Sequence, residues 1–267
     1  MQHSDIGATG DGPAALRDLI LAQTHQGAGV PVLLRTSPPG PDEVEPFGAD
    51  AYRLQVALAA RLLDGPGSAD AGPDPETRPE SGVLAGRLLE RPLLALNFHR
   101  IRGRNQTVVR EQLTRAAALG PSFDLDAPAH PPGEVRVLVA FYDGFARTAE
   151  FAADQCRRLG LKALFFPIFF SPRSGRLLTD ADLAALAKVH EVGWHTTSHV
   201  AAADVDEATV QAEVVDPFRR IERVTGRAPR IGAWRGGTRF DPTKLGNRAL
   251  ADLGLTRLVS NWSVEGV

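Results

Sequence analysis

Apolar and polar residues in the second part of the chain alternate between two patterns. Short apolar runs that suit buried parallel strands alternate with segments in which apolar residues recur at helical spacing. The expected strands cover residues 93–100, 135–142, 162–170, 191–195, 230–234 and 257–262. The expected helices cover residues 146–160, 179–189, 206–226 and 241–254. This repeating βα order predicts an α/β domain, either an open doubly wound sheet or a barrel.

The first part of the chain has a less regular pattern. Helical spacing at residues 13–25 and 48–64 flanks a short apolar run at residues 30–36. Gly, Pro, Asp, Ser and Glu dominate residues 64–82, which is typical of a linker. We therefore divide the chain into an N-terminal region at 1–64, a flexible linker at 65–90 and the α/β domain at 91–267. The N-terminal region is either a separate cap or a source of elements that the domain lacks.

Composition narrows the class of protein. The chain has 267 residues, of which 43% are hydrophobic and 23% charged, as in ordinary globular proteins. The net charge of -2 and the absence of dense Lys or Arg runs exclude an electrostatic nucleic-acid footprint. No run of 18 apolar residues and no signal-peptide pattern occurs, so we expect a cytoplasmic protein without a membrane partner. Cys156 is the single cysteine, which excludes an intramolecular disulfide.

Polar side chains follow several of the expected strands. Asp143, His199 and Arg235 follow the ends of three of them, and His195 and His99 lie at the carboxyl ends of the strands at 191–195 and 93–100. The carboxyl ends of parallel strands share one edge, so these residues are expected to converge there. Two imidazoles and a carboxylate have the composition of an open metal site. Each alone has a simpler interpretation, such as an Asp-Gly turn, but their placement at successive strand ends favours the metal site.

Three stretches resemble motifs of the polysaccharide deacetylases that carry a NodB homology domain, carbohydrate esterase family 4. Residues 140–144, Ala-Phe-Tyr-Asp-Gly, correspond to the family's Thr-Phe-Asp-Asp-Gly motif. Residues 191–199, Glu-Val-Gly-Trp-His-Thr-Thr-Ser-His, match its His-Ser/Thr-x-x-His motif closely, and residues 234–237, Trp-Arg-Gly-Gly, match its arginine loop loosely. The resemblance covers about residues 91–267.

The resemblance implies a distorted (β/α) barrel and a site for a divalent metal. It assigns Asp143, His195 and His199 as the metal ligands, and zinc as the expected ion, with cobalt, nickel and iron as alternatives. In the family this metal polarises the acetamide carbonyl and lowers the pKa of the attacking water. The resemblance also gives Arg235 the role of orienting the catalytic aspartate.

Two positions depart from the family's pattern. Tyr142 stands where the family has the aspartate that deprotonates water, and a tyrosine of ordinary pKa near 10 is a poor base at neutral pH. Loss of a general base typically lowers the rate by about 10² to 10⁴. The family's final Leu-x-His strand is expected beyond residues 261–267 and is not found in this sequence, so the barrel is expected to lack its last strand or strands. The acid of the reaction would then come from His99, Glu265 or a partner chain.

The leading hypothesis is a metal-dependent hydrolase of carbon–nitrogen bonds that deacetylates an N-acetylated sugar or a polysaccharide. A small amide is the alternative substrate. Tyr142, Arg235 and His99 are the expected catalytic residues. The alternative function is a catalytically silent deacetylase-like module that binds carbohydrate or has a regulatory role, with the metal site retained. The sequence leaves the oligomeric state open.

Overall fold

The structure, a computed structural model, describes residues 29–36, 49–65, 79–172 and 174–267. The helix expected at residues 13–25 lies outside them. The strands are β1 Val30–Leu34, β2 Leu93–Phe98, β3 Arg136–Tyr142, β4 Ala163–Phe166, β5 Glu191–Val192, β6 Ile231–Ala233, β7 Arg257–Val259 and β8 Val264–Gly266. The α-helices are α2 Ala49–Asp64, α3 Pro79–Glu90, α4 Gln106–Leu119, α5 Ala146–Arg158, α6 Asp180–Leu186, α7 Asp216–Thr225 and α8 Leu245–Asp252. Short 3₁₀ turns occupy Gly103–Asn105 and Ala202–Asp204, and a π-helical segment, η4, covers Gln211–Val215.

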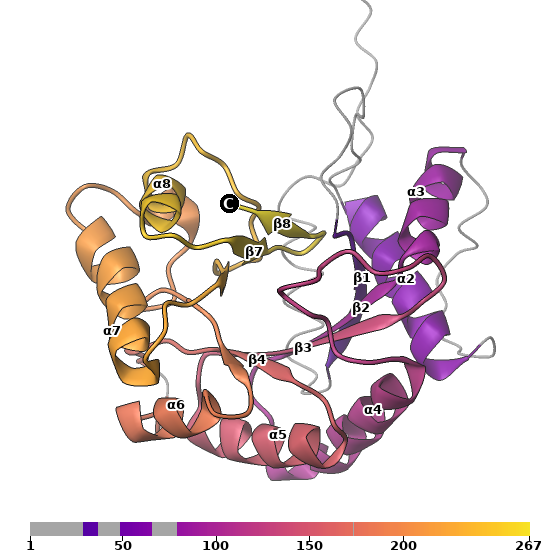
Figure 1. Cartoon of the computed structure of the whole chain (residues 1–267), viewed down its shortest axis with the longest axis horizontal. Coiled ribbons are helices and arrows are strands. Elements are labelled where there is room, and N and C mark those ends of the chain that lie inside the picture. The colour runs from indigo at the N-terminus through magenta and orange to yellow at the C-terminus, as the bar shows by residue number, and fades with distance from the viewer. Residues whose placement is uncertain (1–28, 37–48, 66–78, 173) are drawn as a thin grey trace, which may run out of the picture.

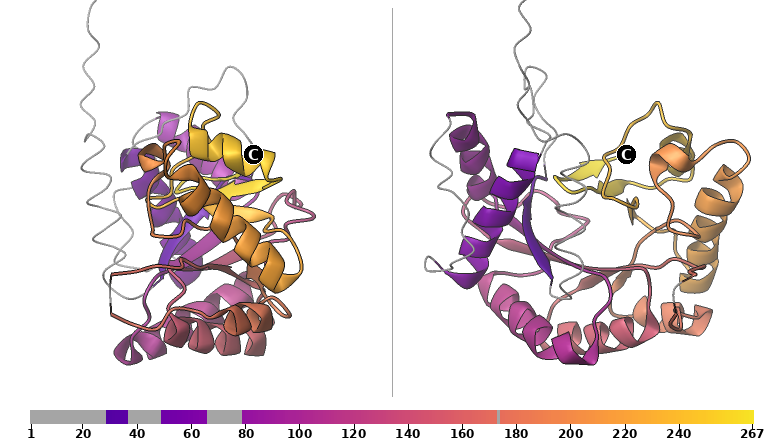
Figure 2. Two further views of the ribbon diagram at one scale, coloured as in Figure 1. Left: turned by 90° about the vertical axis from the view of Figure 1, so that its left-hand side faces the viewer. Right: turned by 180° about the vertical axis from the view of Figure 1, so that it is seen from behind.

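The strands form a distorted barrel with the helices outside it (Figure 1). Five strands pair in the order β1-β2-β3-β4-β5, and three more in the order β6-β7-β8. The pairs from β2 to β5 are parallel, as is β6 with β7. Isolated bridges join the two sheets on both sides, at Trp194 with Gly232 and at Arg35 with Ser263. The fold class expected from the sequence, an α/β fold with parallel strands and surrounding helices, is therefore confirmed, and Figure 2 shows it from two further sides.

Strand β1 closes the barrel between β2 and β8. It runs antiparallel to β2, and the backbone N–H of Arg35, just beyond it, donates to Trp262 O at 3.0 Å. Val264 N donates in turn to Arg35 O at 2.8 Å. The buried Gln55 side chain of α2 donates to both Leu33 O and Trp262 O across this seam. An element from the first part of the chain thus contributes to the same barrel as the strands after residue 91.

Helix α3 occupies Pro79–Glu90, which the sequence assigned to a flexible linker. Leu84 and Leu88 lie four residues apart, so they share one face of this helix, and both are buried in the core between helices and strands. The segment with apolar residues at helical spacing covers only the end of the expected linker. Many polar residues precede it, so the helical pattern of α3 is difficult to recognise in the sequence. Residues 66–78 of the same stretch lie outside the described part of the chain.

The strands are buried on both faces, which explains their nearly continuous apolar sequences. In β3 the side chains facing the barrel interior are Leu138, Ala140 and Tyr142. Those facing the helices are Val137, Val139 and Phe141. A third cluster, which includes Trp194, Trp234 and Phe218, packs α7 and α8 onto the ends of β5 and β6. These clusters hold the carboxyl ends of the strands in place around one rim.

Local sequence features explain where the elements end. Strand β4 stops at Phe166, earlier than expected, because Pro167 has no N–H for the ladder. Helix α6 begins with a capping box between Thr179 and Asp182, and α7 ends at Gly226 in the left-handed conformation. The helix expected at residues 206–226 divides into η4 and α7.

Within the described residues, no helix has the length and apolar character that crossing a membrane requires.

Candidate metal centre

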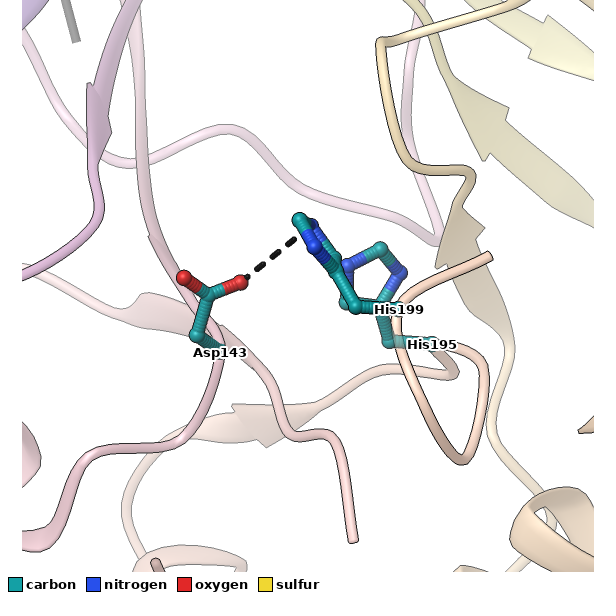
Figure 3. A group of neighbouring side chains, drawn as sticks. All are labelled: Asp143, His195 and His199. Atoms are coloured by element: carbon teal, nitrogen blue, oxygen red, sulfur yellow. Dashed lines mark ion pairs between the residues drawn. The ribbon is translucent and has the colours of Figure 1, made fainter. Parts of the chain in front are cut away.

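Three side chains expected to bind metal meet at the carboxyl rim of the barrel (Figure 3). Asp143 directly follows β3, while His195 and His199 lie in the loop after β5. One ligand atom from each residue lies within 4.8 Å of the other two. Asp143 Oδ1 and His199 Nε2 are 3.4 Å apart, close to the separation of about 3.4 Å expected for two ligands of one tetrahedral zinc ion.

Two of these residues have unusual backbone conformations. Asp143 has φ 67° and His199 has φ 65°, and no other described residue except glycine has a positive φ. Such conformations cost about 1 to 3 kcal/mol each and persist where the surrounding structure holds them, often at functional sites. The chain therefore uses strained turns to direct these two side chains toward each other.

His195 is fixed in one tautomer. Its Nδ1 lies 2.5 Å from Ala233 O and can only donate to that carbonyl, so Nε2 carries a lone pair. The pKa of His195 is lowered to about 4, chiefly by burial and next by the nearby His199, against the opposing effects of Asp143 and the Ala233 carbonyl. The ring is therefore neutral at pH 7, as metal coordination requires. A carbonyl bonded to the second ring nitrogen is the usual outer support of a metal-binding histidine.

Two buried polar atoms of the site have no hydrogen-bond partner among the described residues. They are Asp143 Oδ1 and His195 Nε2, on side chains that are 4% and 1% exposed. A buried acceptor without a donor costs about 1 to 3 kcal/mol, more when it is charged. A cation would satisfy both atoms, and one carboxylate with two imidazoles suits zinc and neighbouring transition ions. The residues present thus fit a divalent metal.

Residues 129–258 match the sequence model of the family described as polysaccharide deacetylase. This segment is a polysaccharide deacetylase domain. It contains all three residues of the candidate metal centre. The family resemblance expected from the motifs is therefore confirmed. No curated protein matches the chain.

Solved deacetylase structures resemble the chain at low sequence identity. The Streptococcus pyogenes deacetylase PplD in complex with acetate is 16% identical, with a TM-score of 0.48, over 61% of this chain and 80% of that one. IcaB from Ammonifex degensii is 18% identical, with a TM-score of 0.49, over 62% of this chain and 82% of that one.

Tyr142 lies inside the barrel of the deacetylase domain, beside the metal centre. Its hydroxyl donates to Asn97 Oδ1 at 3.2 Å, and its ring stacks on His99 and Phe166 with centroids 5.1 Å apart in both pairs. Burial raises the pKa of Tyr142, and the nearby Tyr52 and Asp143 raise it further. The hydroxyl stays protonated at neutral pH, so Tyr142 is not a base for water.

The other expected site residues differ in their surroundings. His99 is partly buried against the Tyr142 ring, and Arg235 is exposed in the turn after β6. Glu265 accepts from Arg239 Nε at 3.1 Å and from Phe240 N at 2.8 Å, so its carboxylate already has two partners. The catalytic roles of Tyr142, His99 and Arg235 stay predictions.

Two residues close to the candidate metal centre were not among those expected from the sequence. Asn97 is the single polar residue in an apolar strand, which was a detectable sign of an inward-facing polar group. Glu213 accepts hydrogen bonds from the backbone and the hydroxyl of Ser198, next to His199. Its only sign in the sequence was Pro217, a proline inside an expected helix, which marks an irregular backbone.

Proposed function

We propose that this chain is a metal-dependent N-deacetylase of an N-acetylated carbohydrate, with Asp143, His195 and His199 as the metal ligands. The observation that carries the proposal is the pair of buried ligand atoms, Asp143 Oδ1 and His195 Nε2, left without hydrogen bonds beside His199. Their place in a polysaccharide deacetylase domain supports acetamide hydrolysis over other metal chemistry.

Zinc is the ion that we propose for this site, with cobalt, nickel or iron as alternatives for the same ligands. When bound, such an ion polarises a carbonyl group and lowers the pKa of water. His195 offers a neutral Nε2 because Ala233 O holds its other nitrogen. Asp143 supplies a negative charge in a buried position, where electrostatic attraction is stronger than in water.

The chain's own residues also limit the reaction. Tyr142 keeps its proton and directs it to Asn97 Oδ1, so it does not accept a proton from water. Without a general base at this position, we expect turnover about 10² to 10⁴ times slower than with one. His99, whose ring stacks on that of Tyr142, is proposed as the proton donor to the leaving amine. Arg235, which matches the family's arginine that orients the catalytic aspartate, is proposed to line the site together with Tyr142.

A catalytically silent carbohydrate-binding or regulatory module is the second candidate function. The hydrogen bond between Tyr142 and Asn97 favours it, because the position of the family's base is occupied by a side chain with a fixed structural partner. A small amide substrate in place of a sugar is a variant of the leading proposal.

Acetate release separates these functions. Native protein and Tyr142→Asp are assayed with N-acetylglucosamine oligomers and added zinc or cobalt, and Tyr142→Phe is the control that keeps the ring but not the hydroxyl. Release by native protein supports the deacetylase. Release by Tyr142→Asp alone supports the silent module. Loss of activity in His99→Ala, with metal still bound, would support the proton-donor role, and unchanged activity would exclude it.

Metal binding is measured separately. Native protein is expected to bind cobalt with a visible absorption spectrum, and His195→Ala is expected to lose it. Equal cobalt binding by both proteins would contradict the ligand set and therefore both candidate functions.

A further inference from the structure

The loop that carries both histidines rests on the π-helical segment η4, Gln211–Val215. Thr197 Oγ1 donates to Ala212 O at 2.5 Å, and Thr197 N donates to Glu213 O at 3.3 Å. The indole N–H of Trp194 donates to Val214 O at 3.0 Å. Three consecutive carbonyls of η4 thus accept hydrogen bonds from the metal-binding loop.

Pro217 explains why the first two of these carbonyls are available. In an α-helix, Glu213 O would accept from the N–H of residue 217, but proline has none. The N–H of Asp216 donates to Gln211 O, in the π-helical register, and so bypasses Ala212 O. In that register Ala212 O would again need the N–H of Pro217. Short π-helical segments of this kind often occur at functional sites.

The Glu213 side chain adds a direct contact beside His199. Its Oε2 accepts from Ser198 N at 2.9 Å, and its Oε1 accepts from Ser198 Oγ at 2.6 Å. Ser198 is therefore held at two points, directly before the residue whose φ is 65°. A left-handed histidine needs such constraints, because an L-residue released from them relaxes toward negative φ.

We infer that Glu213 is a positioning residue for the metal centre: by holding Ser198 it keeps His199 in the left-handed conformation that directs Nε2 at Asp143. This inference rests on the proposed function, since it assumes that His199 is a metal ligand. Glu213 itself does not touch the ligand atoms. It acts through hydrogen-bond geometry, so an amide of the same shape retains the role, with its oxygen accepting from Ser198 N and its nitrogen donating to Ser198 Oγ.

The test measures cobalt affinity and the visible spectrum of bound cobalt in the full chain. Glu213→Ala is expected to bind cobalt about 10 to 100 times more weakly than native protein, the usual effect of losing an outer support, with an altered spectrum. Glu213→Gln is expected to restore both. The matched control is Glu222→Ala on the neighbouring helix α7, whose carboxylate pairs with exposed Arg219 and for which native affinity is expected.

Each outcome decides the inference. Native affinity in Glu213→Ala, while His195→Ala loses cobalt, overturns the positioning role alone. Equal loss in Glu213→Gln and Glu213→Ala also overturns it, because the carboxylate would then act through its charge. Native protein that binds no cobalt overturns the proposed function and this inference with it. If Glu213→Ala fails to fold, Ser198→Ala decides: weaker binding supports the inference and native affinity overturns it.

Discussion

Buried carboxylates at the two ends of the parallel strands have opposite surroundings. At the amino end, Glu191 is 1% exposed, and its Oε2 lies 3.4 Å from each of three cations, Lys162, Arg227 and Arg230. Lys162 and Arg230 directly precede β4 and β6, the strands on either side. At the carboxyl rim, the Asp143 side chain is 4% exposed, and its Oδ1 lies 3.4 Å from His199 Nε2 but has no hydrogen-bond partner in the described part of the chain.

This difference suggests that the charges at the amino end serve stability and that those at the carboxyl rim serve function. Buried polar groups in native proteins are nearly always partnered, and the exceptions call for an explanation. At the amino end the Glu191 carboxylate meets this rule, with three cations around it, although the Nε of Arg230 has no hydrogen-bond partner in the described part of the chain. The carboxyl rim violates it at two atoms, Asp143 Oδ1 and His195 Nε2, and adds two strained backbone positions. Removing charge from the two ends should therefore have opposite consequences, which matched amide substitutions can test.

Asp143→Asn should have the largest effect, and it should fall on metal affinity. The substitution removes a charged ligand, so we expect cobalt or zinc affinity to drop by more than the roughly 10- to 100-fold typical of outer supports. Asparagine tolerates the left-handed conformation and carries no unpaired charge, so the metal-free variant should unfold with the same or a higher free energy. Metal titration and urea unfolding check the two statements. A clear loss of metal-free stability would contradict the contrast between the ends.

Added zinc should stabilise the native protein against unfolding. At a free zinc concentration 100 times the dissociation constant, a ligand that binds only the folded state adds about 2.7 kcal/mol. Glu191→Gln should show the same increase, because the amino end does not hold the metal. At the same zinc concentration Asp143→Asn should show little increase in the free energy of unfolding. A chelator should reverse the increase in each protein that shows one. An equal increase in all three proteins would place the metal elsewhere.

Glu191→Gln should lower the free energy of unfolding and leave metal affinity unchanged. Breaking a buried ion pair typically costs 3 to 5 kcal/mol, but the three cations here are one-third to one-half exposed, so about 1 to 3 kcal/mol is expected. Glu134→Gln, which changes a half-exposed carboxylate paired with Arg136, is the control and should cost less than about 1 kcal/mol. Weaker cobalt binding in Glu191→Gln would show that the two ends are coupled.

The smallest effect should be a pH dependence at the amino end. His190 accepts from Ala163 N and lies 3.2 Å from Ala153 O, and burial lowers its pKa below the ordinary 6.5, with a further contribution from Lys162. The folded state favours the neutral ring, so its contribution is complete above pH 6.5. It is lost as the pH falls from 6.5 toward the lowered pKa, because the unfolded chain takes up the proton first. Metal-free native protein should therefore lose more stability between pH 7.5 and 5.5 than His190→Gln, as measured by urea unfolding. Equal losses would contradict this role.

Many elements of the fold and the three proposed metal ligands could be predicted from the sequence, because the patterns that indicate them are local. Apolar runs and helical spacing located β2, β3, β6 and α5, and proline, glycine and capping residues fixed several boundaries. The strand ends also brought Asp143, His195 and His199 into one group, since parallel strands present their carboxyl ends to a common rim. The helix at Gln106–Leu119 and strand β8 were not among the expected elements. The first has a low contrast between its faces, and the second is only three residues long.

Only the tertiary structure decided which hydrogen-bond donors and acceptors of these elements pair with one another. The sequence determined the fold class and the residue types of the site, because these depend on periodicity and chain order. It did not determine that β1 closes the barrel through Arg35, that Tyr142 gives its proton to Asn97, or that Glu213 holds the loop of His199. Each of these contacts joins groups that are distant in sequence or register, and which donor meets which acceptor is fixed only when the whole barrel packs.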